Sequence, residues 1–228
     1  MANPIRLVME VGPKGKRVIA VAPDWPGLER GAKTEEAAIE RLRAYLPRYQ
    51  PVVTLAGMGA AFAPTGSFEV VERYPGSSST DFWGISFAFS AIDQQPLTAE
   101  ALERELALMQ ASWSFFDDVR SRVSAEMRAG PRGGGRDRER IVRHVLFAQQ
   151  DWAKKIGVAA PLDVLMTDQG LTAHRNAYCD AIRQFHAQGK LAGKVAKWPL
   201  RYLIRHTAYH TLDHAWEMED NDLGGAGA

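Results

Sequence analysis

The sequence predicts an α+β protein in which a small N-terminal α+β domain precedes an antiparallel four-helix bundle. In the first half of the chain, short apolar segments alternate with Gly-, Pro- and Ser-rich turns, which is typical of strands. Near Ile92 the apolar residues begin to recur every three or four positions, which is the period of an amphipathic helix. Long helical segments with short connections favour an antiparallel bundle. We therefore place the two domains at residues 1–92 and 96–222.

The predicted N-terminal domain begins with a β-hairpin. Residues 5–11 and 17–22 have strand-like patterns, and Gly12-Pro-Lys-Gly15 between them predicts a turn. Thr34 is a suitable helix N-cap, and the two glutamates that follow it suit the helix dipole. We expect this helix to end at Pro47, because proline in a helix interior removes a hydrogen bond. Three short strands are expected after it, at residues 51–55, 67–73 and 84–90.

Four helices are predicted for the second domain. Thr98 is a suitable N-cap for the first, whose apolar residues recur to Met127. A glycine-rich mobile loop at residues 130–135 is expected to end it. The other helices are predicted at residues 137–156, 171–188 and 198–220.

Composition and charge exclude several kinds of partner. The net charge of +1 in 228 residues provides no strong field for nucleic acid or an anionic membrane. No apolar stretch approaches the ~20 residues that span a bilayer, and the start of the chain lacks the pattern of a secretory signal. The single cysteine, Cys179, excludes an internal disulfide and fits a reducing compartment. We expect a cytoplasmic protein without nucleic-acid or membrane partners.

Histidines form the most informative pattern of the chain. His206, His210 and His214 are spaced at i, i+4 and i+8, so on a helix they lie along one stripe. The stripe spans about 12 Å at a rise of 1.5 Å per residue, so one ion binds an adjacent pair more easily than all three. The pair is either His206 with His210 or His210 with His214. His144 in the second predicted helix is the leading candidate for a third ligand.

Other polar and aromatic residues are assigned supporting, surface or packing roles. Asp213 or Glu217 could orient an imidazole or become a ligand itself. His174 and His186 lack metal-binding spacing and are expected at the surface. The remaining residues are assigned to packing (Trp113, Phe116, Trp152 and Cys179) or to a solvated surface (Asp117 and Asp118).

Two segments carry a resemblance to a known family. In residues 141–152, Ile-Val-Arg-His-Val-Leu-Phe-Ala-Gln-Gln-Asp-Trp, a histidine of the second helix precedes an aromatic residue. Residues 210–220, His-Thr-Leu-Asp-His-Ala-Trp-Glu-Met-Glu-Asp, place a His-x-x-x-His pair before an acidic stretch late in the last helix. In these features the second half of the chain resembles the DinB-like (damage-inducible) four-helix metalloprotein superfamily.

The resemblance implies a zinc, nickel or iron site with three histidine ligands, and kinship with thiol-dependent S-transferases and isomerases. The family's frequent His-x-x-x-His-Arg-Gly-Gln ending is absent, because Thr211 follows His210 and Ala215 follows His214. We prefer His144, His210 and His214 as the ligands, with His206 as the alternative. No further catalytic residue is identified.

The start of the chain is similar to HicB-like domains. The matching segments are Arg-Val-Ile-Ala-Val-Ala-Pro-Asp-Trp-Pro-Gly at residues 17–27 and Gly-Ala-Lys-Thr-Glu-Glu-Ala-Ala at residues 31–38. Because the chain continues into the predicted bundle instead of a DNA-binding extension, the similarity implies an accessory binding or dimerising role.

Together these observations favour a metal-dependent enzyme, a thiol S-transferase or a hydrolase, that uses a divalent transition metal as a Lewis acid. Its substrate would be a small molecule such as a low-molecular-weight thiol, and the protein would be cytoplasmic and could form a homodimer. The alternative hypothesis is a non-catalytic metal-binding bundle fused to a HicB-like interaction domain.

Overall fold

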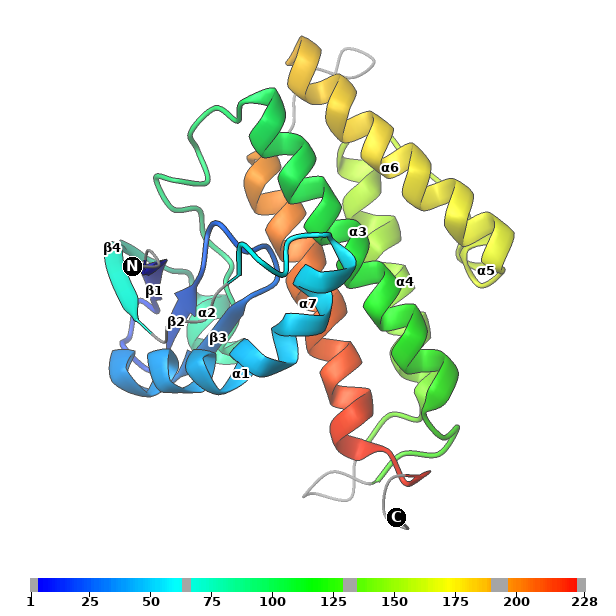
Figure 1. The fold of residues 1–228 in the computed structure, drawn as a ribbon, viewed down its shortest axis with the longest axis horizontal. Helices are drawn as coiled ribbons and strands as arrows, with labels where there is room; N and C mark the ends of the chain where they lie inside the picture. The colour runs from blue at the N-terminus through cyan, green and yellow to red at the C-terminus, as the bar shows by residue number, and fades with distance from the viewer. Residues whose placement is uncertain (1–3, 63–66, 129–134, 190–196, 225–228) are drawn as a thin grey trace. The chain divides into compact units, whose positions relative to one another are not determined.

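Four strands and seven helices make up the regular structure of the described residues, so the protein is of mixed α+β class (Figure 1). The structure is a computed structural model that describes residues 4–62, 67–128, 135–189 and 197–224. The elements are, in chain order, β1 (Ile5–Val11), β2 (Val18–Val21), β3 (Glu29–Ala32), α1 (Glu35–Leu55), β4 (Phe68–Pro75), α2 (Ser78–Trp83), α3 (Ala99–Arg122), α4 (Arg138–Lys155), α5 (Leu162–Leu165), α6 (Asp168–Gln188) and α7 (Leu200–Asn221).

The chain divides into two compact units. The first unit contains Met1–Ser112 and Ile204–Tyr209, and the second contains Trp113–Leu203 and His210–Ala228. Helices α3 and α7 therefore contribute residues to both units. No helix of the described residues combines the length and the apolar character that crossing a bilayer requires.

The first unit is built on a four-stranded sheet with the order β3-β2-β1-β4. The predicted hairpin is confirmed, since β1 and β2 pair antiparallel, and β4 then joins the other edge of β1 in parallel. Helix α1 packs on one face of β2 and β3, and the guanidinium of Arg30 lies 3.6 Å from the centre of the Tyr45 ring on this side. The opposite face carries an apolar cluster of Val8, Ile19, Val21, Tyr74 and Ile92.

Helix α1 overturns two predictions at once. It does not end at Pro47, and residues 51–55 are its last turn instead of a strand. Pro47 and Pro51 stand one turn apart on the exposed side, while a continuous apolar stripe on the other side is buried. The two carbonyls that lose a helical N–H donor therefore lie on the exposed side, where water can satisfy them, and burial of the stripe carries the helix through both prolines.

The strand predicted at residues 84–90 is also wrong. Three of its N–H groups bond to buried carboxylates instead of to a neighbouring strand. Phe87 and Ala88 donate to the Glu10 carboxylate at 3.0 and 3.2 Å, and Ser90 donates to Asp93 at 2.8 Å. Because buried backbone donors need partners, the carboxylates hold this segment in an irregular path. The Ser-rich segment before it forms the short helix α2 after Ser77.

A network of buried charges lies on the apolar-cluster side of the sheet. Arg205 of α7 donates to both oxygens of Asp93 at 2.7 and 2.8 Å and to Glu29 at 2.9 Å. The neighbouring carboxylate of Glu10 accepts from the hydroxyls of Ser86 and Tyr74 at 2.6 and 3.1 Å. These pairings offset part of the cost of burying the charges, although Oε1 of Glu29 is buried without a hydrogen-bond partner. The network joins β1, β3 and residues 86–93 to the part of α7 that belongs to the first unit.

Three predicted helices of the second domain have close counterparts in the structure, and they are α4, α6 and α7. The Asp137 side chain caps α4 by accepting from the N–H of Arg140 at 2.8 Å, and Gly189 ends α6 in the left-handed conformation with φ of 68°. Helix α3 begins after the predicted cap Thr98 but ends at Arg122, earlier than expected. The short helix α5 was not predicted. The loop expected at residues 130–135 lies almost entirely outside the described residues.

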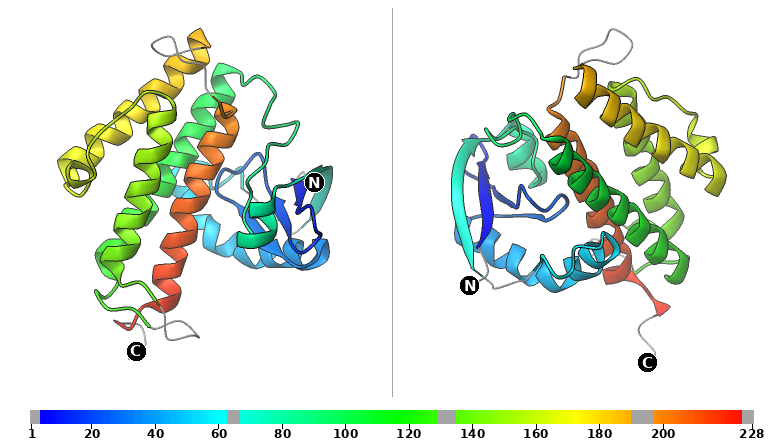
Figure 2. Two further views of the ribbon diagram at one scale, coloured as in Figure 1. Left: turned by 180° about the vertical axis from the view of Figure 1, so that it is seen from behind. Right: turned by 45° about the horizontal axis from the view of Figure 1, so that its top comes forward.

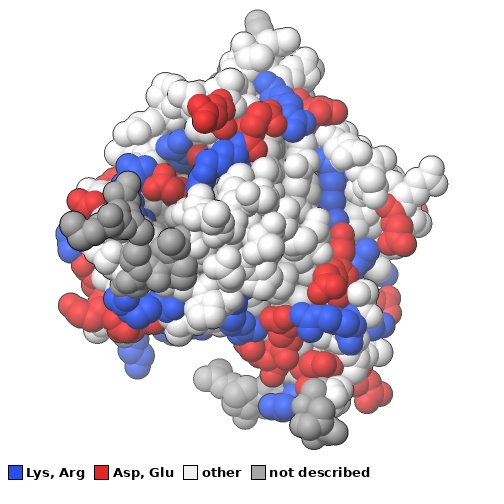
Figure 3. Space-filling model, viewed as in Figure 1, with Lys and Arg blue, Asp and Glu red and all other residues white. Residues whose placement is uncertain are grey.

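On the face shown in Figure 3, charged side chains of both signs surround a broad uncharged area, and neither sign gathers there into a large patch. The distribution agrees with the net charge of +1. It provides no extended basic surface on that face.

Candidate metal centre

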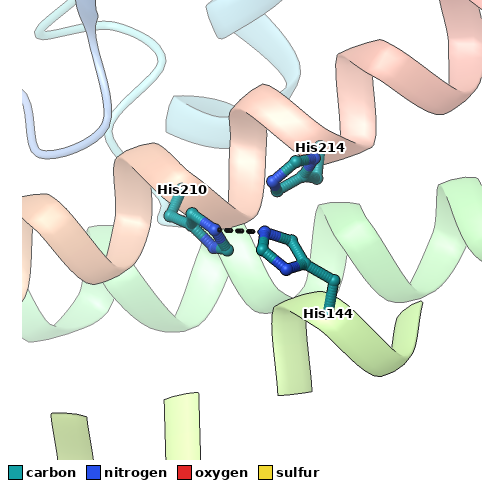
Figure 4. A group of neighbouring side chains, drawn as sticks. All are labelled: His144, His210 and His214. Carbon is teal, nitrogen blue, oxygen red and sulfur yellow. Dashed lines mark hydrogen bonds between the residues drawn. The ribbon is translucent and has the colours of Figure 1, made fainter. Parts of the chain in front are cut away.

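Three histidines from two helices converge in the second unit. His144 comes from α4, and His210 and His214 come from adjacent turns of α7 (Figure 4). One ligand atom from each ring lies within 4.8 Å of the other two. The Nε2 atoms of His210 and His144 are 3.1 Å apart. Residues separated by 66 positions in the sequence thus present their ring nitrogens to one small volume.

The spacing of these nitrogens fits a single transition metal ion. Bonds of about 2.0–2.1 Å at a tetrahedral angle place two imidazole nitrogens about 3.4 Å apart. The observed separations, 3.1 Å for one pair and at most 4.8 Å for the others, lie around this value. Small side-chain rotations would therefore bring all three nitrogens to bonding distance. Imidazole donors suit zinc, nickel and iron.

Contacts between α4 and α7 position the rings. Gln149, buried on α4, donates a long hydrogen bond of 3.5 Å to the Thr211 hydroxyl. About one turn after Gln149 on α4, the Trp152 ring meets the His210 ring edge to face, with centres 5.1 Å apart. The part of α7 from His210 onward runs beside α4 in Figures 1 and 2. Contacts between α4 and α7 thus fix the positions of the three histidines relative to one another.

Glu217 orients the innermost histidine. Its carboxylate lies 2.5 Å from Nδ1 of His214, and this hydrogen bond lowers the pKa of Glu217. A carboxylate that accepts from Nδ1–H fixes the tautomer in which Nε2 is free to act as a ligand. Glu217, one of the two acidic residues proposed from the sequence, therefore contacts a ring of the cluster.

Exposure increases across the cluster. His214 is buried, His210 is partly buried and His144 is exposed. Although His144 is exposed, its ring is partly shielded from water, and this desolvation, together with the nearby charges of His214 and Arg136, lowers the pKa of His144 to about 4. His144 is therefore neutral near pH 7, which is the form that binds metal. The cluster combines an anchored inner histidine with an outer one that solvent can reach.

His206 has different surroundings. It is buried in the first unit, where its ring centre lies 5.7 Å from that of Phe87. Burial and the charge of Arg205 lower its pKa to about 3. The one group of potential metal ligands found among the described residues contains His144, His210 and His214 and does not include His206. The structure thus brings the preferred three residues together and leaves the alternative ligand outside the group.

Three interpretations from the sequence need correction. His174 is buried and not at the surface, with 4% of its area exposed, and His186 is partly buried. Asp117 pairs with the nearly buried guanidinium of Arg175 instead of facing only solvent. Trp152 does more than pack in a core, because it borders the histidine cluster.

Two residues beside Trp152 were missed by the sequence interpretation. The Trp198 ring centre lies 6.5 Å from that of Trp152, and the Lys155 ammonium lies 4.7 Å from the centre of the Trp198 ring. The sequence does place Trp152 near the site, because it follows His144 by eight positions, close to two helical turns. That spacing gives no signal for Trp198 or Lys155.

Comparison of the chain with models of protein families, with curated proteins and with solved structures finds no match. Function is therefore inferred from the histidine cluster and its surroundings.

Proposed function

We propose that His144, His210 and His214 bind one divalent transition metal ion, zinc, nickel or iron, and that the protein is a metal-dependent enzyme. The observation that carries the proposal is the convergence of three ring nitrogens within 4.8 Å of one another. Three histidines leave a tetrahedral or larger coordination sphere with an open position, as catalytic sites require. Structural sites are closed by a fourth protein ligand.

The exposure of the cluster supports catalysis over a purely structural role. His144 is exposed, so a small molecule can approach the ligands from solvent. Glu217 holds His214, and the Trp152 ring restricts the His210 ring. A divalent ion at such a site supplies Lewis acidity, which lowers the pKa of a coordinated water or thiol and makes a nucleophile near neutral pH.

The reaction class that we propose is thiol S-transfer or hydrolysis on a DinB-like four-helix bundle. Support comes from four long helices in the second half of the chain and from the order of the ligands, with one histidine on α4 and a His-x-x-x-His pair on α7. The proposal assigns residues 96–222 to this bundle and residues 1–92 to a HicB-like interaction domain. For the latter, support comes from the hairpin of β1 and β2 followed by β3 and α1.

The test is a transfer assay on the metal-loaded full chain, with common low-molecular-weight thiols and an electrophilic acceptor, and a parallel assay for hydrolysis. His144→Gln should lower the rate at least about a hundredfold, since it removes a ligand of the metal. His186→Gln, a matched change on α6 outside the cluster, should leave the rate unchanged.

Two results together would contradict catalysis. They are the absence of transfer and hydrolysis with every thiol and acceptor, and an X-ray absorption spectrum in which protein atoms fill all metal positions. That combination would favour the non-catalytic metal-binding bundle.

A further inference from the structure

A hollow in the first unit lies between the β1–β2 turn and helix α2. Its volume is about 460 Å³, and its lining consists of Pro13, Lys14, Lys16, Ser78, Ser79, Asp81, Phe82 and Trp83. This volume is in the range of pockets that hold small ligands. None of the lining residues belongs to the histidine cluster or to the buried charge network.

The aromatic wall of the hollow is unusually open to solvent. Phe82 is 74% exposed and Trp83 is 66% exposed, which are the two highest values among the exposed large hydrophobic side chains of the described residues. The two rings meet edge to face, with centres 4.6 Å apart and planes at 84°. Because exposed apolar area is unfavourable in water, adjacent open rings of this size mark a surface that binds a partner.

The opposite wall is basic and held in place by the backbone. The Asp81 carboxylate accepts from the N–H groups of Lys14 at 2.7 Å, Lys16 at 2.8 Å and Arg17 at 3.2 Å. These bonds fasten the hairpin turn to α2, so the hollow is formed before any ligand arrives. Both lysines are exposed, and neither ammonium takes part in a salt bridge with a described residue. The Asp81 carboxylate lies in the same lining and interacts electrostatically with Lys16, so the two lysines leave this wall with a net positive charge that can attract an anion.

We propose that this hollow binds a nucleotide, with the base against Phe82 and Trp83 and the phosphate at Lys14 and Lys16. A nucleotide combines a planar aromatic group with an anion, and base stacking on aromatic side chains together with a basic wall is a general way to bind one.

The nucleotide can be free in solution or part of a single strand. The net charge of +1 provides no strong field to attract a long nucleic-acid strand. We therefore expect the contacts of a single nucleotide unit to dominate the affinity.

Calorimetric titration of the full chain tests the proposal. The ligands are nucleoside 5′-monophosphates, the matching nucleosides, ribose 5-phosphate, a six-residue single strand and an acidic hexapeptide. The monophosphates should bind at least about fivefold more tightly than the nucleoside or ribose 5-phosphate, each of which lacks one of the two contacts. Added salt should weaken binding, because it screens the phosphate from the lysines.

Matched variants assign the contacts. Trp83→Ala and the double change of Lys14→Ala with Lys16→Ala should each weaken nucleotide binding at least about fivefold. Phe147→Ala, an exposed aromatic of α4, and Lys33→Ala, an exposed lysine after β3, should leave it unchanged. Circular dichroism checks that each variant is folded.

The single-strand arm identifies the source of the ligand. A strand that binds more tightly than the monophosphate indicates nucleic acid, and equal affinity indicates the free nucleotide. The proposal is overturned if no nucleotide or strand binds, if ribose 5-phosphate binds as tightly as the monophosphate, or if the variants bind like the original chain. Binding of the acidic peptide alone would also overturn it, in favour of a protein partner.

Discussion

At the scale of single residues, the candidate metal centre depends on a few side chains whose roles differ. His144, His210 and His214 provide the converging nitrogens, and Glu217 fixes the ring of His214 through Nδ1. The pair on the last helix could be predicted from the sequence, because a helix places residues four apart on one stripe. His144 could be named as the third ligand because it lies in another predicted helix of the same domain. The sequence could not show that His206 lies outside the group of three, because this depends on the burial of His206 beside Phe87.

Glu217 provides the first prediction. Glu217→Gln replaces a charged acceptor with a weaker neutral one, so His214 loses part of its orientation and basicity. We expect metal affinity to fall about 10–100-fold, measured by competition with a chelator of known affinity. Glu219→Gln, two positions along the same helix, is the control and should bind metal normally. Equal affinity in both variants would show that Glu217 does not position His214.

Glu29 provides a prediction about pH. Burial raises its pKa from 4.5 to about 7, although the charge of Arg205 opposes the increase. The folded state therefore retains a proton that the unfolded chain releases, and this contribution to stability is present below about pH 4.5 and is lost as pH rises through about 7. Asp93 has a lowered pKa and titrates below this window.

We expect Glu29→Gln to remove this contribution. Between pH 5 and 8, the free energy of unfolding of the variant should change less with pH than that of the original chain, by on the order of 2 kcal/mol. Urea denaturation at several pH values measures it. Parallel pH profiles of the two proteins would mean that Glu29 does not titrate in this range.

At the scale of elements, local signals predicted some parts well and others poorly. The hairpin and the start of α4 near Asp137 were predicted from turn residues and from the helical pattern, which act within a few positions. The strand β3 was missed because Glu29 and Arg30 are charged, and their burial depends on partners far along the chain. The segment at residues 84–90 was assigned to a strand because nothing local shows that Glu10 would bind its backbone.

Helix α1 provides a prediction at this scale. Pro47 lies on the exposed side of the helix interior and deprives the Arg43 carbonyl of its donor. Pro47→Ala should restore that hydrogen bond and increase the free energy of unfolding by about 1 kcal/mol or more, since proline costs more than this in most helix interiors. Pro13→Ala in the β1–β2 turn is the control and should give no increase. A loss of stability in Pro47→Ala would indicate that the helix requires the proline.

At the scale of the whole molecule, helix α7 contributes to both compact units. Its residues Ile204–Tyr209 belong to the first unit, where Arg205 bonds to Asp93. His210 and the residues after it belong to the second unit. One continuous helix therefore carries the centre of the buried charge network and two of the three proposed ligands. Composition and periodicity predicted the α+β class, but they do not show that residues of one helix belong to two compact units.

Metal binding should stabilise the folded chain as a whole-molecule effect. A ligand present at a hundred times its dissociation constant, and bound only by the folded state, adds about 2.7 kcal/mol. We expect zinc or nickel to raise the midpoint of thermal unfolding by several degrees in the original chain and to leave that of His210→Gln unchanged. An equal increase in both proteins would place the stabilising metal elsewhere.

The most direct test of the account is the metal content of the purified protein and of two variants that differ by one turn of α7, His210→Gln and His206→Gln. The account predicts about one transition metal ion per chain in the original protein and in folded His206→Gln, and loss of that ion in folded His210→Gln. Full metal content in His210→Gln, or metal lost only in His206→Gln, would contradict the assignment of the site.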